Sequence, residues 1–230
     1  MLKAIKKVPI IKKAQPFEIQ LKDNIKDSVN KYWEEFICEK EGYWDGKILS
    51  VARFDVNNFV IEVGEAQYSW LIYSKNHNDL DVRSFFVSIL LKTLDDKYVL
   101  IKNNHNKFNI IGGMADSKDL NGDYFSPELC LKRELFEELH LDLKNKNHVL
   151  NYQMKYLKTP EPGRNYGFVY IGNLNFYSKD LLDYFSLVKD IVDSEVNHVL
   201  LLNSEEVLQL DLTDNDISYL KDLISYEVKE

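Results

Sequence analysis

Apolar and polar positions along the chain alternate in patterns that predict both helices and strands. At residues 25–39, apolar side chains recur every three or four positions, as on one face of a helix that ends before Gly42. Short runs rich in β-branched and aromatic residues then predict strands at residues 47–54, 59–63 and 69–73. The first third of the chain therefore combines one amphipathic helix with short strands.

The middle of the chain predicts a hairpin followed by a long polar loop and a helix. Residues 85–94 and 98–102 are apolar runs joined by a polar turn, and residues 108–111 lead into Gly112-Gly113. Residues 114–125 are polar and loop-like. The helix is predicted from about residue 127 to 139, with Ser126 as N-cap, Pro127 at its first position and an acidic residue in its first turn.

The last third continues the mixture of elements. Paired strands are predicted at residues 152–157 and 166–174, then a helix at 179–188, a strand at 196–202 and a final amphipathic helix. Strands on both sides of a helix favour an α/β fold, with a mixed β-sheet between helices in an α/β/α sandwich. Residues 1–80 are interpreted as an N-terminal α+β extension packed on a core domain at 81–230; the alternative is a separately folded domain at 1–78.

Composition and charge restrict the function. The 230 residues contain 29 Lys and Arg against 37 Asp and Glu, a net charge of −8, which argues against a nucleic-acid duplex as partner. Two cysteines form no disulfide framework, and no apolar run approaches the roughly 18 residues of a membrane span. The N-terminus also lacks the apolar region of a signal peptide. These features predict a cytoplasmic protein with no membrane partner.

Three carboxylates share one face of the predicted helix at residues 127–139. Glu134, Glu137 and Glu138 follow Arg133 at helical spacing, which places them side by side just after the glycine pair. Hard divalent cations such as Mg²⁺ and Mn²⁺ prefer oxygen ligands of this kind. The alternative is an ordinary solvated acidic helix face. The glycine pair and the flanking strands favour a metal site, with Glu134 and Glu138 as its main ligands.

The stretch from Gly113 to Leu141 resembles the signature of the Nudix family of pyrophosphohydrolases, G-x5-E-x7-R-E-U-x-E-E-x-G-U, where U is aliphatic. The residues that match its core are Arg133, Glu134, Leu135, Glu137 and Glu138. The resemblance implies a Nudix-like fold, Mg²⁺ or Mn²⁺ on the three glutamates, and catalytic roles for Arg133, Glu137 and Glu138. It also implies hydrolysis of a nucleoside diphosphate derivative, and a homodimer is plausible in this family.

Three departures from the family pattern bear on activity. Phe125 stands where the first glutamate belongs, the segment after Gly113 is six residues longer than the pattern, and His140 replaces the last glycine. Since that glutamate mainly braces the arginine in the family, Arg133 is expected to pair instead with Glu137, Asp123 or Glu128. His140 is expected to impose a different chain exit, because a left-handed cap is less easy without glycine.

These departures leave two alternatives to a hydrolase open. One is a Nudix-fold module that binds or senses nucleotides with weak catalysis or none. The other is a structural or interaction protein with a solvated acidic helix.

A second group of residues is predicted to contact substrate. Gly113 lets the backbone approach a metal or phosphate, and the loop at 159–166 holds Glu161, Arg164 and Tyr166 between two predicted strands. Arg164 is suited to a phosphate, Tyr166 to stacking on a base, and Glu161 to the general base that some Nudix proteins carry in a later loop. The alternative is a hairpin loop shaped by proline and glycine with solvated charges.

Overall fold

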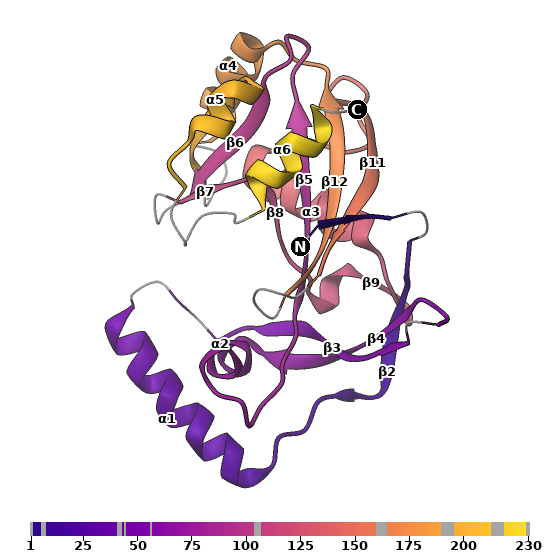
Figure 1. Ribbon diagram of the computed structural model, residues 1–230, viewed down its shortest axis with the longest axis vertical. Coiled ribbons are helices and arrows are strands. Elements are labelled where there is room, and N and C mark those ends of the chain that lie inside the picture. Colours follow the sequence, from indigo (N-terminus) through magenta and orange to yellow (C-terminus); the bar gives the residue numbers. More distant parts are fainter. Residues whose placement is uncertain are drawn as a thin grey trace.

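Two β-sheets form the frame of the protein. The computed structural model describes residues 2–5, 8–40, 43, 45–55, 57–103, 107–159, 165–189, 196–212 and 219–228. Figure 1 shows the larger sheet in the upper part of the molecule and the smaller sheet below it, with α1 on the outside of the smaller one.

The helices of the described chain are α1 (Asp23–Glu39), α2 (Tyr68–Asn76), α3 (Pro127–Leu139), α4 (Ser178–Val188), α5 (Ser204–Gln209) and α6 (Leu220–Glu227), with a 3₁₀ turn, η1 (Ser117–Asp119). The first strands are β1 (Leu2–Ala4), β2 (Ile10–Glu18), β3 (Lys47–Asp55), β4 (Val60–Gln67), β5 (Phe85–Lys92), β6 (Tyr98–Asn103) and β7 (Phe108–Asn109). The remaining strands are β8 (Ile111–Met114), β9 (Leu120–Asn121), β10 (Tyr124–Phe125), β11 (Val149–Lys158), β12 (Tyr166–Leu174) and β13 (Val196–Leu202).

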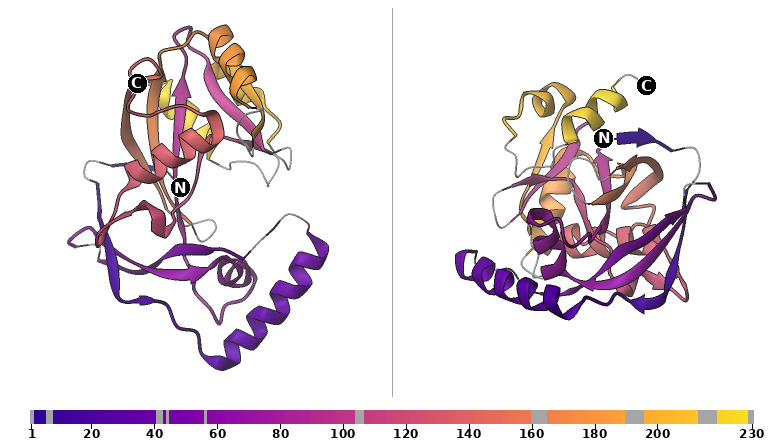
Figure 2. Two further views of the ribbon diagram at one scale, coloured as in Figure 1. Left: turned by 180° about the vertical axis from the view of Figure 1, so that it is seen from behind. Right: turned by 60° about the horizontal axis from the view of Figure 1, so that its bottom comes forward.

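The larger sheet lies between two layers of helices. Its strand order is β1-β11-β12-β5-β6-β13, with β8 paired to β5 and β7 to β6, and it is mixed because β12 and β5 are parallel. Successive residues of β5 point to opposite faces: Ile89 and Leu91 share a core with α3 and α4, whereas Leu90 joins α5 and α6. The two views in Figures 1 and 2 show α6 and α3 on opposite sides of this sheet. The predicted α/β sandwich with a mixed sheet is confirmed.

The smaller sheet contains strands from both sides of the predicted domain boundary at residue 80. Its order is β3-β4-β2-β10-β9, so β9 and β10 from beyond residue 80 complete a sheet begun by the N-terminal segment. In the other direction, β1 pairs with β11 in the larger sheet. The division into residues 1–80 and 81–230 remains a prediction, and strands cross that boundary both ways.

Most predicted elements occur, and one is of the wrong type. The predicted strand at residues 69–73 is wrong, because this segment belongs to helix α2. Five of the nine residues of α2 are buried, so its apolar run lacks a helical period, and a short run of this kind cannot be assigned from periodicity alone. The predicted loop at 114–125 contains η1, β9 and β10. Within the described ranges, no helix has the length and apolar character needed to cross a membrane.

Candidate active site on helix α3

The glycine pair of β8 lies directly against two glutamates of α3. The backbone N–H of Gly112 donates a hydrogen bond to Glu138 Oε2 over 2.8 Å. A Cβ atom on Gly113 would collide with the carboxyl group of Glu134. Glycine at position 113 is therefore required for Glu134 to occupy this place, and two carboxylates meet two successive residues of one strand.

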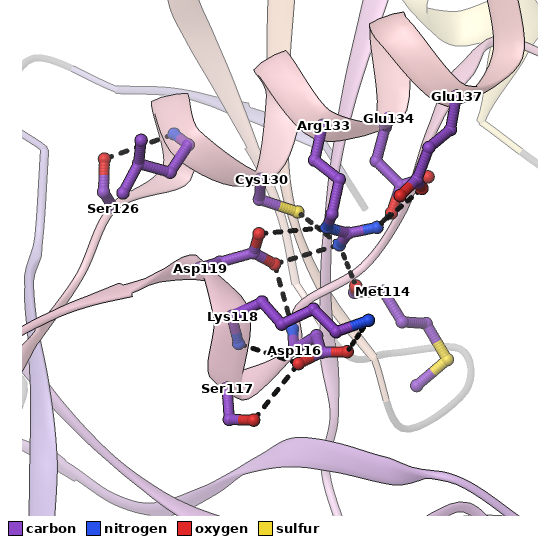
Figure 3. A network of polar contacts seen from close by, with 11 residues as sticks. Met114, Asp116, Ser117, Lys118, Asp119, Ser126, Cys130, Arg133, Glu134 and Glu137 are labelled. Atoms are coloured by element: carbon purple, nitrogen blue, oxygen red, sulfur yellow. Dashed lines mark hydrogen bonds and ion pairs between the residues drawn. The ribbon is translucent and has the colours of Figure 1, made fainter.

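Arg133 lies at the centre of the polar network of the site (Figure 3). Its Nε and Nη2 atoms donate to the two carboxylate oxygens of Asp119 over 3.1 and 3.0 Å. On its other side, Nη1 lies 2.7 Å from Glu134 Oε1 and 3.0 Å from Glu137 Oε2. Nη2 also donates to the Met114 carbonyl over 3.2 Å. One guanidinium thus joins the loop after β8 to two of the three predicted metal ligands.

The partners of Arg133 were only partly predicted. Pairing with Glu137 is confirmed. Pairing with Asp123 is wrong, since its carboxylate is 80% exposed and lies 3.9 Å from Lys13. Pairing with Glu128 is also wrong, because Glu128 accepts a hydrogen bond from the Tyr152 hydroxyl over 2.9 Å and lies near Lys144.

Asp119 is the site residue that sequence reasoning missed. It ends the short turn η1, where Asp116 is the N-cap and Asp119 closes a reciprocal capping box. The available signal was an Asp-x-x-Asp pattern of the capping-box kind inside a loop predicted to be irregular. Asp119 lies 14 positions before Arg133, outside the place of the family's first glutamate, which Phe125 occupies here.

Phe125, at the place of the missing glutamate, is a core residue. Its side chain is 5% exposed and meets the ring of Phe85 edge-on, with ring centroids 4.7 Å apart. This departure therefore strengthens the apolar core beneath the loop.

His140 ends α3 in the left-handed conformation, with φ 57° and ψ 27°. The predicted change of chain exit is wrong: the backbone keeps the geometry that glycine favours, with a histidine in it. The ring packs on Phe136 at 4.3 Å, and the Tyr184 hydroxyl donates to the His140 carbonyl over 2.8 Å. Among the described residues, Nδ1 of His140 is buried without a hydrogen-bond partner.

Burial dominates the electrostatics of the site. Loss of solvent raises the pKa of Glu134 to about 7; Arg133 opposes this shift, and the charge of Glu137 adds to it. Burial alone would lower the pKa of Arg133, but the hydrogen bond to Asp119 and the charge of Glu134 raise it instead. Burial also raises the pKa of the Cys130 thiol well above its usual value, so this thiol stays protonated. An acid that is costly to ionise is characteristic of a functional site.

The carboxylates beside β8 are oxygen donors, the ligand type that a hard cation prefers. Within the described ranges, no three Asp, Glu, His or Cys side chains are gathered closely enough to hold an ion. Glu134 and Glu137 both contact Arg133, and Glu134 and Glu138 lie against the glycine pair. Mg²⁺ is commonly held by one or two carboxylates together with water and substrate phosphates. Metal ligation by Glu134, Glu137 and Glu138 therefore remains a prediction. The positions of Glu134 and Glu138 are compatible with it.

Of the predicted substrate residues, Gly113 lies against Glu134, Tyr166 lies apart from this network, and the other two lie outside the described residues. Tyr166 begins β12, is 7% exposed and meets Phe54 edge-on at 6.0 Å. It pairs with Phe85, two residues along β5 from Val87, the partner of Gly113. Glu161 and Arg164 lie outside the described residues. The proposed contacts of all four with substrate remain predictions.

Comparisons with known proteins give distant structural likenesses only. No protein-family model and no curated protein matches the chain. Among solved structures, the chain is similar to DR0079 from Deinococcus radiodurans, with 15% identity over 79% of this chain and 98% of that one and a TM-score of 0.49. It is also similar to the Nudix domain of Shewanella oneidensis NrtR complexed with ADP ribose, with 17% identity, coverage of 69% and 96%, and a TM-score of 0.43.

A third likeness is to a MutT protein from Methanosarcina mazei Go1, with 14% identity, coverage of 64% of this chain and 96% of that one, and a TM-score of 0.42. Because all three TM-scores are below 0.5, these likenesses assign neither a family nor an activity to this chain.

Proposed function

We propose that the protein is a Nudix-type hydrolase that cleaves a diphosphate linkage in a nucleoside diphosphate derivative, with Mg²⁺ or Mn²⁺ as cofactor. The observation that carries this proposal is the seating of Glu134 and Glu138 against Gly112 and Gly113. The substrate class follows from the resemblance of residues 113–141 to the family signature.

In this proposal the residues of α3 have separate roles. Glu134 and Glu138 hold the ion, and Glu137 is a third ligand or orients the attacking water. Arg133 fixes the carboxylates of Glu134 and Glu137 by charge-assisted hydrogen bonds. When bound, a divalent ion neutralises the diphosphate and lowers the pKa of a coordinated water. Glu161, Arg164 and Tyr166 are assigned to the substrate side.

A nucleotide-binding or sensor module is the second candidate. Arg133 contacts Glu134 at 2.7 Å and Glu137 at 3.0 Å, and a site that keeps these pairs has fewer carboxylate oxygens to offer a metal or a water. The replacement of the first glutamate by the core residue Phe125 points the same way.

One experiment separates the two candidates. Release of phosphate or nucleotide is measured on nucleoside diphosphate sugars, dinucleoside polyphosphates and nucleoside triphosphates, with Mg²⁺, with Mn²⁺ and with chelator. Glu138→Gln is the test variant. Glu128→Gln is its matched control, because Glu128 lies on the same helix but contacts Tyr152 instead of the glycine pair.

Metal-dependent turnover that is lost in Glu138→Gln and kept in Glu128→Gln supports the hydrolase. Nucleotide binding without turnover, followed as a thermal shift, supports the module. A rate that is the same with chelator and in Glu138→Gln contradicts the metal site.

A further inference from the structure

The loop between β8 and α3 is bonded to the N-terminal extension on both sides. On one side, the carbonyl of Ala115 accepts a hydrogen bond from Leu49 N of β3 over 3.1 Å. On the other, Tyr124 of β10 pairs with Lys12 of β2, and Lys13 N donates to the Asp123 carbonyl over 2.8 Å. The lengthened segment thus contributes β9 and β10 to the smaller sheet.

Asp119 is fixed inside this loop and removed from water. Its carboxylate accepts a hydrogen bond from Asp116 N over 3.0 Å, and its carbonyl accepts one from Ser126 N, the N-cap of α3, over 3.0 Å. Among the described residues, the two buried carboxylates are Asp119, 2% exposed, and Glu134, 9% exposed. Arg133 lies between them and contacts both.

We propose that Asp119 is the positioning residue for Arg133 and, through Arg133, for Glu134 and Glu137, and that strands β2 and β3 hold it in place. The guanidinium is planar, so the two hydrogen bonds that Nε and Nη2 donate to Asp119 set its plane and direct Nη1 at the two glutamates. Phe125 cannot supply this negative partner, and the lengthened loop supplies it instead. The N-terminal extension then supports the candidate active site through the loop that carries Asp119.

The inference rests on the proposed function for the role of the two glutamates, and its test uses metal affinity as well as a readout that needs no metal. Mn²⁺ binding to the full chain is followed by electron paramagnetic resonance. Asp119→Asn is expected to weaken binding about 10- to 100-fold, the usual loss for a residue that orients a ligand. Asp123→Asn is the matched control, because this exposed acid of the same loop does not contact Arg133, and it is expected to bind Mn²⁺ as the wild type does.

A metal-free readout separates failure of the inference from failure of the proposed function. Hydrogen exchange at Arg133 Nε–H is expected to be slow in the wild type and in Asp123→Asn, and faster in Asp119→Asn. Slow exchange in Asp119→Asn, or Mn²⁺ affinity within twofold of the wild type, overturns the inference. A wild type that binds no Mn²⁺ contradicts the proposed function, and the Nε–H exchange then decides the positioning role alone.

A double-mutant cycle with Arg133→Lys tests the coupling between the two residues. If Asp119 acts through Arg133, the double variant is expected to bind Mn²⁺ no more weakly than the weaker single variant. Additive losses overturn the inference. Hydrogen exchange of the Asp116 and Ser126 amides reports whether the loop stays folded. If these amides exchange rapidly in Asp119→Asn, the cycle is repeated with Asp119→Glu in place of Asp119→Asn, and additive losses again overturn the inference.

Discussion

A charge pair on the smaller sheet and the pair that joins α3 to η1 differ in their exposure to solvent. On the smaller sheet, Lys12 and Glu62 pair across neighbouring strands at 3.1 Å with side chains 44% and 27% exposed. Beside α3, Arg133 and Asp119 pair at 3.0 Å with side chains 22% and 2% exposed. The separations are nearly equal, but the second pair is largely withdrawn from solvent.

This difference has an energetic meaning. An exposed pair is screened by water and salt, and it contributes little to stability. A buried pair must offset the loss of hydration of both charges, so it rarely raises stability over an apolar equivalent. The charges around α3 are therefore better explained by a function than by folding, whereas Lys12 and Glu62 form an ordinary surface pair.

The largest expected effect is a pH dependence of stability due to Glu134. Without metal, its folded pKa of about 7 exceeds the ordinary 4.5, so the folded state holds this proton more tightly than the unfolded state. The stabilisation is complete below about pH 4.5 and is lost as pH rises to about 7. At about 1.4 kcal/mol per pKa unit, the loss is roughly 3 kcal/mol.

Urea unfolding with chelator between pH 4.5 and 8 measures this loss, as the difference between the wild type and Glu134→Gln. If the difference in unfolding free energy between the two proteins does not change with pH, Glu134 is not buried in the way that the structure shows.

The next effect comes from filling the space at the glycine pair. In Gly113→Ala the new methyl group takes the place of the Glu134 carboxyl. We expect a loss of about 1–3 kcal/mol in unfolding free energy and a loss of Mn²⁺ affinity of about tenfold or more.

Gly122→Ala is the control, since its methyl group meets nothing within 4 Å and only the positive φ of 62° opposes it. It is expected to cost about 1 kcal/mol and to leave Mn²⁺ binding unchanged. Equal Mn²⁺ affinity in both variants would contradict the seating of Glu134.

A smaller effect is expected at the end of α3. His140 has φ 57°, which glycine adopts without penalty and alanine does not. His140→Gly is expected to be more stable than His140→Ala by about 1 kcal/mol, or about 2–4 °C in Tm. Since both variants lack the imidazole ring, the difference between their melting temperatures measures the backbone effect alone. Equal melting temperatures would show that the left-handed conformation at residue 140 carries no strain.

The smallest effect is expected on the smaller sheet. Lys12→Gln removes the exposed pair with Glu62 and is expected to cost less than about 1 kcal/mol, with no change in Mn²⁺ binding. The cost should vanish in about 1 M salt, where charges are screened beyond roughly 3 Å. A larger, salt-independent loss in chemical unfolding would remove the contrast between the exposed pair and the buried one.

Local signals predicted α3 and the approach of its glutamates to the glycines. Ser126 accepts a hydrogen bond from Leu129 N, and Pro127 follows it, so the start of the helix is encoded within four residues. The spacing of Glu134 and Glu138 needs only the helical repeat. These features could be predicted because each depends on neighbours in the sequence.

The features that were missed depend on contacts distant in sequence. The helical state of α2 is set by burial on several sides, which hides the repeat. The partner of Arg133 could not be found because Asp119 reaches it only after the loop has folded onto β2 and β3. The destination of Phe125 depends on Phe85, forty positions earlier in the chain.

The exchange of strands between the two sheets also sets an order of events during synthesis. The first strand, β1, pairs with β11, so it has no partner until residues 149–158 have left the ribosome. At about 5–20 residues per second this delay is on the order of 10–30 seconds. The β10 partner of β2 also arrives late, with residues 124–125. A nascent chain that has emerged only to residue 80 has neither sheet complete, and β1 waits for its partner strand until β11 follows.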